Sequence, residues 1–146
     1  MISRAFCSNI ASAGSFGCWT WPDRWLLHGD LHHENILWDD ALGWLAIDPK
    51  GVIGPKPMEC GRFLHNFVED EVPGINHLRD APMDDVCEIM EMRIRTFAAA
   101  LGLPRADLLR ASFVDSVLSF CWTSNSDLPF ADELIRVEAG ARLLRH

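Results

Sequence analysis

Residues 28–37 read HGDLHHENIL, and this stretch decides how the rest of the sequence is interpreted. It holds three histidines, two carboxylates and one asparagine, and it runs into an apolar Ile-Leu-Trp. Three interpretations are open at this point: a metal site, a loop that catalyses phosphoryl transfer, or a polar turn between two strands of the core. The surrounding residues separate them.

A metal site would draw its ligands from His28, Asp30, His32 and His33. Residues 29–32, GDLH, resemble the Gly-Asp-x-His element of binuclear metallophosphoesterases. Those enzymes also need an upstream Asp-x-His and a downstream Gly-Asn-His-Glu, and neither occurs in this sequence. A metallophosphoesterase is therefore the weaker alternative.

The spacing of Asp30, Asn35 and Asp48 favours phosphoryl transfer. Protein kinases place an Asn five residues after a catalytic Asp, and a second Asp after a β-hairpin. In this interpretation Asp30 accepts or orients the proton of an attacking hydroxyl. Asn35 and Asp48 would together hold Mg²⁺, because amide and carboxylate oxygens suit this hard cation.

A longer pattern, LLHGDLHHENIL at 26–37 followed by WLAIDPKGVIG at 44–54, resembles the aminoglycoside phosphotransferase family. The most similar branch is that of the aminoglycoside/hydroxyurea resistance kinases, which includes streptomycin 6-phosphotransferases. The resemblance implies a kinase-like fold and ATP-dependent phosphorylation of a hydroxyl on an aminoglycoside such as streptomycin. It makes Asp30 the catalytic base, Asn35 and Asp48 the magnesium ligands, and His28 the anchor of the loop. Glu59 is the residue that can fill an acidic position the family has after its metal segment.

Composition limits the classes of partner. The 146 residues suit one domain with a core. A formal charge of −8 gives no basis for binding nucleic acid or an anionic membrane, and it suits a cationic small molecule. Five cysteines without a CxxC pair predict neither a zinc knuckle nor a disulfide framework. With neither a signal peptide nor a membrane-spanning run in the sequence, we expect a cytoplasmic protein.

The periodicity of the sequence predicts an α+β fold, mostly helical with a short β-hairpin, and the family resemblance makes it a protein-kinase-like C-lobe fragment. Asp39, Asp40 and Gly43 predict the hairpin turn, and the proline-rich residues 49–57 predict a loop. Apolar periodicity then predicts helices within 84–103, 104–122 and 130–146, the first capped by Asp84 or Asp85. One face of that first helix is expected to carry Val86, Ile89, Met90, Ile94, Phe97 and Leu101.

We expect residues 1–24 to be a loosely ordered leader and residues 25–146 to be a partial C-lobe. Family members carry an N-terminal lobe that covers the ATP phosphates and supplies a lysine. Both lysines of this chain, Lys50 and Lys56, follow the HGD motif, so we expect the N-lobe to be absent and the chain alone to be catalytically incomplete. A non-catalytic remnant or binding module is the alternative. The uncovered apolar runs predict marginal stability and self-association.

Overall fold

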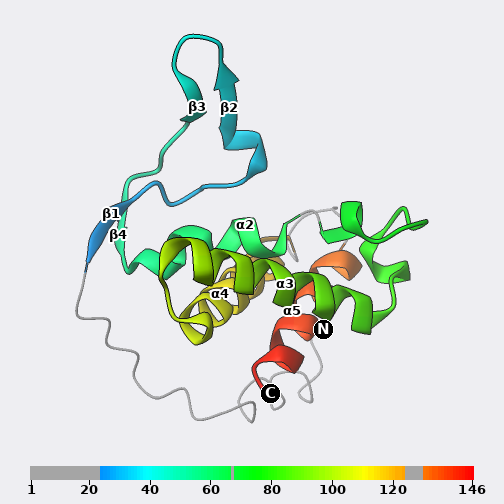
Figure 1. Cartoon of the computed structure of the whole chain (residues 1–146). Coiled ribbons are helices and arrows are strands. Elements are labelled where there is room, and N and C mark those ends of the chain that lie inside the picture. Colours follow the sequence, from blue (N-terminus) through cyan, green and yellow to red (C-terminus); the bar gives the residue numbers. More distant parts are fainter. Residues whose placement is uncertain (1–23, 67, 124–129) are drawn as a thin grey trace.

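The computed structural model describes residues 24–66, 68–123 and 130–146. Two small antiparallel sheets of two strands each precede three long helices, so the predicted α+β class, mostly helical, is confirmed (Figure 1). Apart from Arg24, the predicted leader lies outside the described residues. Within the described part of the chain, no helix combines the length and the apolar character needed to cross a membrane.

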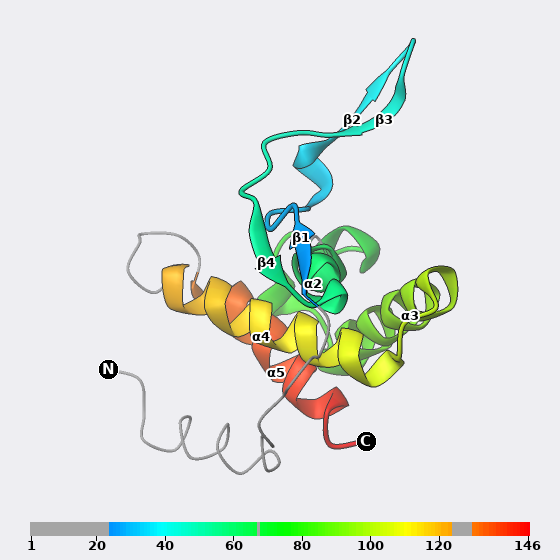
Figure 2. The same cartoon turned by 90° about the vertical axis from the view of Figure 1, so that its left-hand side faces the viewer.

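The predicted hairpin is confirmed, and it consists of β2 (Ile36–Asp39) and β3 (Gly43–Ala46). Asp39 begins the turn by accepting hydrogen bonds from the backbone N–H groups of Ala41 and Leu42, at 2.9 and 2.8 Å. Gly43 ends the turn with a φ of +81°, a conformation that favours glycine. The hairpin projects away from the helices in both views (Figures 1 and 2).

The prediction of a loop across residues 49–57 is wrong in its centre. Val52–Gly54 forms β4, which pairs with β1 (Trp25–Leu27), with Leu27 opposite Val52. The partner strand lies far back in the sequence, so the local proline and glycine signals could not reveal this pairing. Its consequence is that the segment after Asp48 returns to the HGD motif: the N–H groups of Lys50 and Gly51 donate to the carbonyl of His28, at 2.8 and 3.2 Å.

All three predicted helices are present, as α3 (Met83–Leu101), α4 (Arg105–Thr123) and α5 (Phe130–Leu143). A short helix, α2 (Gly61–His65), precedes them. The predicted cap of α3 is wrong, because Pro82 occupies the N-cap position and no side chain caps the helix. Asp84 and Asp85 instead lie in its first turn, where their charge still favours the helix dipole. Gly102 ends α3 in the left-handed conformation.

The core lies between the helices, where α4 packs against both α2 and α5, and α5 packs against α3. From the predicted face of α3, Val86, Met90 and Ile94 are fully buried, and Ile89 and Phe97 are partly buried. Leu101, the last residue of α3, is 52% exposed where the chain turns away at Gly102.

The sheets carry many exposed apolar side chains, as expected from the uncovered apolar runs. Leu26 on β1 and Trp44 on β3 are 76% and 71% exposed. Trp38 and Trp44 face each other across the hairpin as an edge-to-face pair, with ring centroids 5.3 Å apart. The other exposed large apolar residues of the sheet region are Trp25, Leu37, Leu42, Ile47, Val52 and Ile53.

Candidate active site

The HGD loop, which we define as residues 28–35, begins directly after β1 and ends in the single 3₁₀ turn His33–Asn35. Gly29 allows the loop to pass close to β4. Its φ is +79°, and a Cβ atom at this position would lie 2.3 Å from Cγ2 of Val52. Only glycine fits there without a shift of the backbone or of Val52.

Glu59 holds the start of the HGD loop. Its two carboxylate oxygens accept hydrogen bonds from the backbone N–H groups of His28, at 2.6 Å, and Gly29, at 3.2 Å. Such charge-assisted bonds to backbone donors are among the stronger hydrogen bonds in proteins. Glu59 was singled out in the sequence as the residue that could fill an acidic position, and the structure places its carboxylate under the loop.

His28 ties the loop to the segment before Asp48. Its Nε2 lies 2.7 Å from the carbonyl oxygen of Ile47. A carbonyl only accepts hydrogen bonds, so Nε2 carries the proton in this contact. This contact agrees with the anchoring role that the resemblance implies for His28.

Asp30 lies among cationic side chains and is mostly buried, with 19% of its side chain exposed. Its Oδ1 accepts a hydrogen bond from Nη1 of Arg62 at 2.6 Å, while its Oδ2 is 3.7 Å from Nζ of Lys50. The loop's own His32 places Nε2 at 3.9 Å from Oδ1. One oxygen of Asp30 is thus firmly held, and the other is only loosely paired.

Asn35 connects Asp30 with the segment that carries Asp48. Its Nδ2 donates to the backbone carbonyl of Asp30 at 2.9 Å. Its own backbone carbonyl accepts from the N–H of Ile47 at 2.9 Å, one residue before Asp48. The structure therefore brings the backbones of the three predicted site segments together.

Asp48 has an exposed carboxylate on a backbone in the left-handed region, with φ at +56°. Its Oδ2 lies 2.5 Å from Nζ of Lys50, the same ammonium group that approaches Asp30. This hydrogen bond and the positive charge of Lys50 lower the pKa of the Asp48 carboxyl, and Asp48 in turn raises the pKa of Lys50. Uncommon backbone geometry of this kind concentrates at functional sites.

These residues fit a magnesium ion better than a histidine-ligated metal. A cation, the Lys50 ammonium, already lies between the carboxylates of Asp30 and Asp48. Mg²⁺ keeps several waters and substrate phosphates, so it needs only one or two protein oxygens. The rings of the HGD loop do not gather: His33 stacks on Phe63 instead, and the described residues contain no group of three or more His, Cys, Asp or Glu side chains that could hold a metal.

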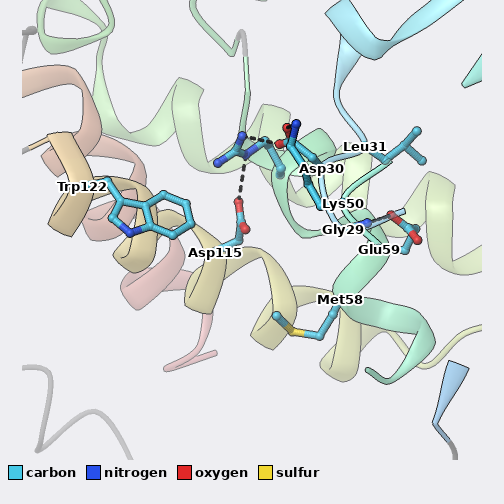
Figure 3. Close-up of a pocket in the computed structure, with 9 residues that line it drawn as sticks. Gly29, Asp30, Leu31, Lys50, Met58, Glu59, Asp115 and Trp122 are labelled. Atoms are coloured by element: carbon cyan, nitrogen blue, oxygen red, sulfur yellow. Dashed lines mark hydrogen bonds and ion pairs between the residues drawn. The ribbon is translucent and has the colours of Figure 1, made fainter. Parts of the chain in front are cut away.

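A pocket of about 380 Å³ opens beside Asp30, and Asp115 and Trp122 of α4 also line it (Figure 3). The sequence does not predict a site role for Arg62, His65, Asp115 or Trp122, because nothing in their spacing distinguishes them from ordinary helix residues. The pocket is lined by Gly29, Asp30, Leu31, Lys50, Met58, Glu59, Arg62, Asp115 and Trp122.

The sequence of this chain is similar to a family of known kinases. Residues 22–127 match the family described as aminoglycoside/hydroxyurea antibiotic resistance kinase. Streptomycin 3''-kinase from Klebsiella pneumoniae is 34% identical over 96 residues, which cover 66% of this chain and 34% of that protein. Streptomycin 6-kinase from Streptomyces glaucescens is 31% identical over 85 residues, or 58% of this chain and 25% of that protein.

The aligned residues thus span about a third and a quarter of these two curated relatives. No solved structure matches the chain. The matched range, residues 22–127, includes every residue that lines the pocket. The chain belongs to the aminoglycoside/hydroxyurea antibiotic resistance kinase family.

Proposed function

We propose that the protein carrying this chain transfers the γ-phosphoryl group of ATP to a hydroxyl of an aminoglycoside, with Asp30 as the base. The observation that carries the proposal is the link between the three site segments. Asn35 bonds to the Asp30 carbonyl with its side chain and to Ile47 with its backbone, and Lys50 approaches the carboxylates of both Asp30 and Asp48.

In the proposed reaction, the acceptor hydroxyl oxygen forms a bond to the γ-phosphorus of ATP. The bond from that phosphorus to the β,γ-bridging oxygen breaks, and ADP leaves with its electron pair. The hydroxyl proton passes to the carboxylate of Asp30. Asp30 faces the pocket and keeps one loosely paired oxygen for this proton.

Asn35 and Asp48 would hold Mg²⁺ through the amide oxygen and the carboxylate. When bound, the ion supplies electrostatic stabilisation to the oxygens of the transferring phosphoryl group. Asp48 has an exposed carboxylate, which a cation can reach from solvent. We further propose that the hairpin and helices correspond to the C-lobe of a kinase-like fold.

Streptomycin is the aminoglycoside that we propose to test first, because both relatives are named as streptomycin kinases. The pocket supports an acceptor with cationic groups on sugar-like rings. It offers the Asp115 carboxylate and the broad face of Trp122, which is 63% exposed, next to Asp30. Carboxylates bind such cationic groups directly, and an aromatic face adds cation–π attraction.

The test uses the whole gene product that carries these residues, with MgATP and streptomycin, and detects the phosphorylated antibiotic by mass spectrometry. We expect phosphorylation by the wild type and a loss of about 10²- to 10⁴-fold in the Asp30→Asn variant. Asp40→Asn, the same substitution in the exposed hairpin turn, is the matched control and should retain the rate. An Asp30→Asn variant as fast as the control would refute the role of Asp30. A wild type that binds streptomycin without phosphorylating it would favour a binding module.

A further inference from the structure

A chain of polar contacts runs from Asp30 into the core between α2 and α4. Nη1 of Arg62 lies 2.6 Å from Oδ1 of Asp30, and its Nε lies 3.8 Å from Oδ2 of Asp115. The same Asp115 oxygen is 2.7 Å from Nε2 of His65. Asp30 and Asp115 both line the pocket, and the Arg62 guanidinium bridges them (Figure 3).

The inner end of this chain, His65, is buried. The side chain of His65 is 1% exposed, and its Nδ1 is buried without a hydrogen-bond partner among the described residues. Asp115 has no proton to donate when ionised, so Nε2 of His65 donates to it. Arg62 and His65 lie three residues apart on α2 and therefore share one side of that helix.

Close packing of α2 on α4 sets the position of Asp115. A Cβ atom on Gly61 would lie 3.0 Å from Cβ of Asp115 and 3.1 Å from the carbonyl oxygen of Ala111. The two helices approach this closely because residue 61 has no side chain. This close contact at Gly61 holds the Asp115 carboxylate beside Arg62.

We propose that Arg62 is a positioning residue for the Asp30 carboxylate, itself held by Asp115 and His65. This inference rests on the proposed function of Asp30. The guanidinium fixes Oδ1, which turns Oδ2, the more loosely paired oxygen, toward the pocket as the atom that receives the acceptor proton. Arginine suits this task because its planar guanidinium group can pair with two carboxylates at once, and a lysine ammonium cannot do so in the same geometry.

A purely structural role would explain the same contacts if Arg62 only joined α2 to α4. The structural role and the positioning role predict different effects of replacing Arg62. A structural link affects the unfolding temperature and leaves the reaction unchanged. A positioning role affects kcat, because small displacements of a reacting group are costly, about 10²-fold for a misplacement of 1 Å.

The kinetic test compares Arg62→Gln, Arg62→Lys and Asp115→Asn in the whole gene product. We expect Arg62→Gln to lower kcat about 10²-fold with little change in the KM for ATP. Arg62→Lys should recover part of kcat, because it keeps the charge but loses the bridge, and Asp115→Asn should give a smaller loss than Arg62→Gln. The matched control is Arg95→Gln on α3, whose side chain is 73% exposed, and it should leave kcat unchanged. An Arg62→Gln kcat equal to that of Arg95→Gln would overturn the inference.

A second readout does not depend on activity. The side-chain carboxyl ¹³C resonance of Asp30, assigned with the Asp30→Asn variant, should move in Arg62→Gln and Asp115→Asn and stay in place in Arg95→Gln. An unmoved resonance in Arg62→Gln would overturn the contact itself. If Arg62→Gln fails to fold, Arg62→Lys is compared with Arg95→Gln in its place.

The two readouts separate the inference from the proposed function. If the wild type does not phosphorylate streptomycin but the Asp30 resonance responds to Arg62, the proposed function fails and the contact stands. If the wild type is active and Arg62→Gln is equally active, the proposed function stands and the positioning role fails.

Discussion

Among single residues, Gly29 carries two separate constraints, its left-handed backbone and its close approach to Val52. An alanine there should cost about 1–2 kcal/mol for the backbone conformation and about 1–3 kcal/mol for the overlap. Gly74 is the matched control, since its φ is +80° but nothing lies within 4 Å of its added Cβ. Urea unfolding should show a larger loss of stability for Gly29→Ala than for Gly74→Ala, and equal losses would contradict the close packing.

Lys50 controls the ionisation of Asp48. Its hydrogen bond and charge lower the pKa of the Asp48 carboxyl, so removing the ammonium group should raise that pKa toward its ordinary value. The measurement is a titration of the Asp48 side-chain ¹³C resonance in the wild type and in Lys50→Met. Lys56→Met, another exposed lysine in the following segment, is the control. A midpoint for Asp48 that Lys50→Met leaves unchanged would show that the two side chains do not pair in solution.

Glu91 of α3 links that helix to the start of α4 through hydrogen bonds with Arg105. Its carboxylate accepts hydrogen bonds from Nε and Nη2 of Arg105, at 2.7 and 2.5 Å, and from Nε of Arg95 at 2.6 Å. The hydrogen bonds from Arg105 are the largest cause of the lowered pKa of Glu91. Partly exposed ion pairs contribute about 0.2–1 kcal/mol, so Glu91→Gln should lower the free energy of unfolding at neutral pH by roughly that amount.

The sign of the pH dependence follows from the lowered pKa. Above the unfolded-state value of 4.5 the contribution of Glu91 is fully present, and it is lost as the pH falls through the lower folded-state value. The stability difference between wild type and Glu91→Gln should therefore shrink in acid. Glu88→Gln, at an exposed position on the same helix, is the control. A difference that stays constant down to the folded-state pKa would contradict the pairing.

Local sequence patterns predicted the hairpin and the helices well, but they predicted contacts between residues far apart in the sequence poorly. Asp39 and Gly43 marked the hairpin because a tight turn is encoded by adjacent residues, and apolar periodicity marked α3 to α5. The β1–β4 pair escaped prediction because its two strands lie far apart in the sequence. His65 and Asp115 are 50 residues apart in sequence, so their contact depends on the packing of α2 on α4. The site residues predicted from sequence, Asp30, Asn35 and Asp48, are those with a characteristic spacing.

For the whole molecule, the exposed hairpin predicts self-association. Trp38 and Trp44 are 60% and 71% exposed, and apolar patches of more than a few hundred Å² usually bind a partner or another copy. Replacing both tryptophans with threonine, which keeps strand propensity, should shift the purified chain toward the monomer in sedimentation velocity. Met92→Gln, at an exposed apolar position on α3, is the control and should not. A wild type that is monomeric and unfolds cooperatively at high temperature would refute this prediction.

We predict that Asn35 and Asp48 hold one divalent cation beside Asp30. The measurement is paramagnetic broadening by Mn²⁺ in the presence of ATP, because Mn²⁺ replaces Mg²⁺ at oxygen sites and broadens only nearby amide resonances. We predict that broadening is confined to residues 28–36 and 46–51 in the wild type. It should persist in Asp40→Asn and be lost in Asp48→Asn. Broadening centred on the acidic first turn of α3, or broadening that Asp48→Asn leaves intact, would contradict the claim.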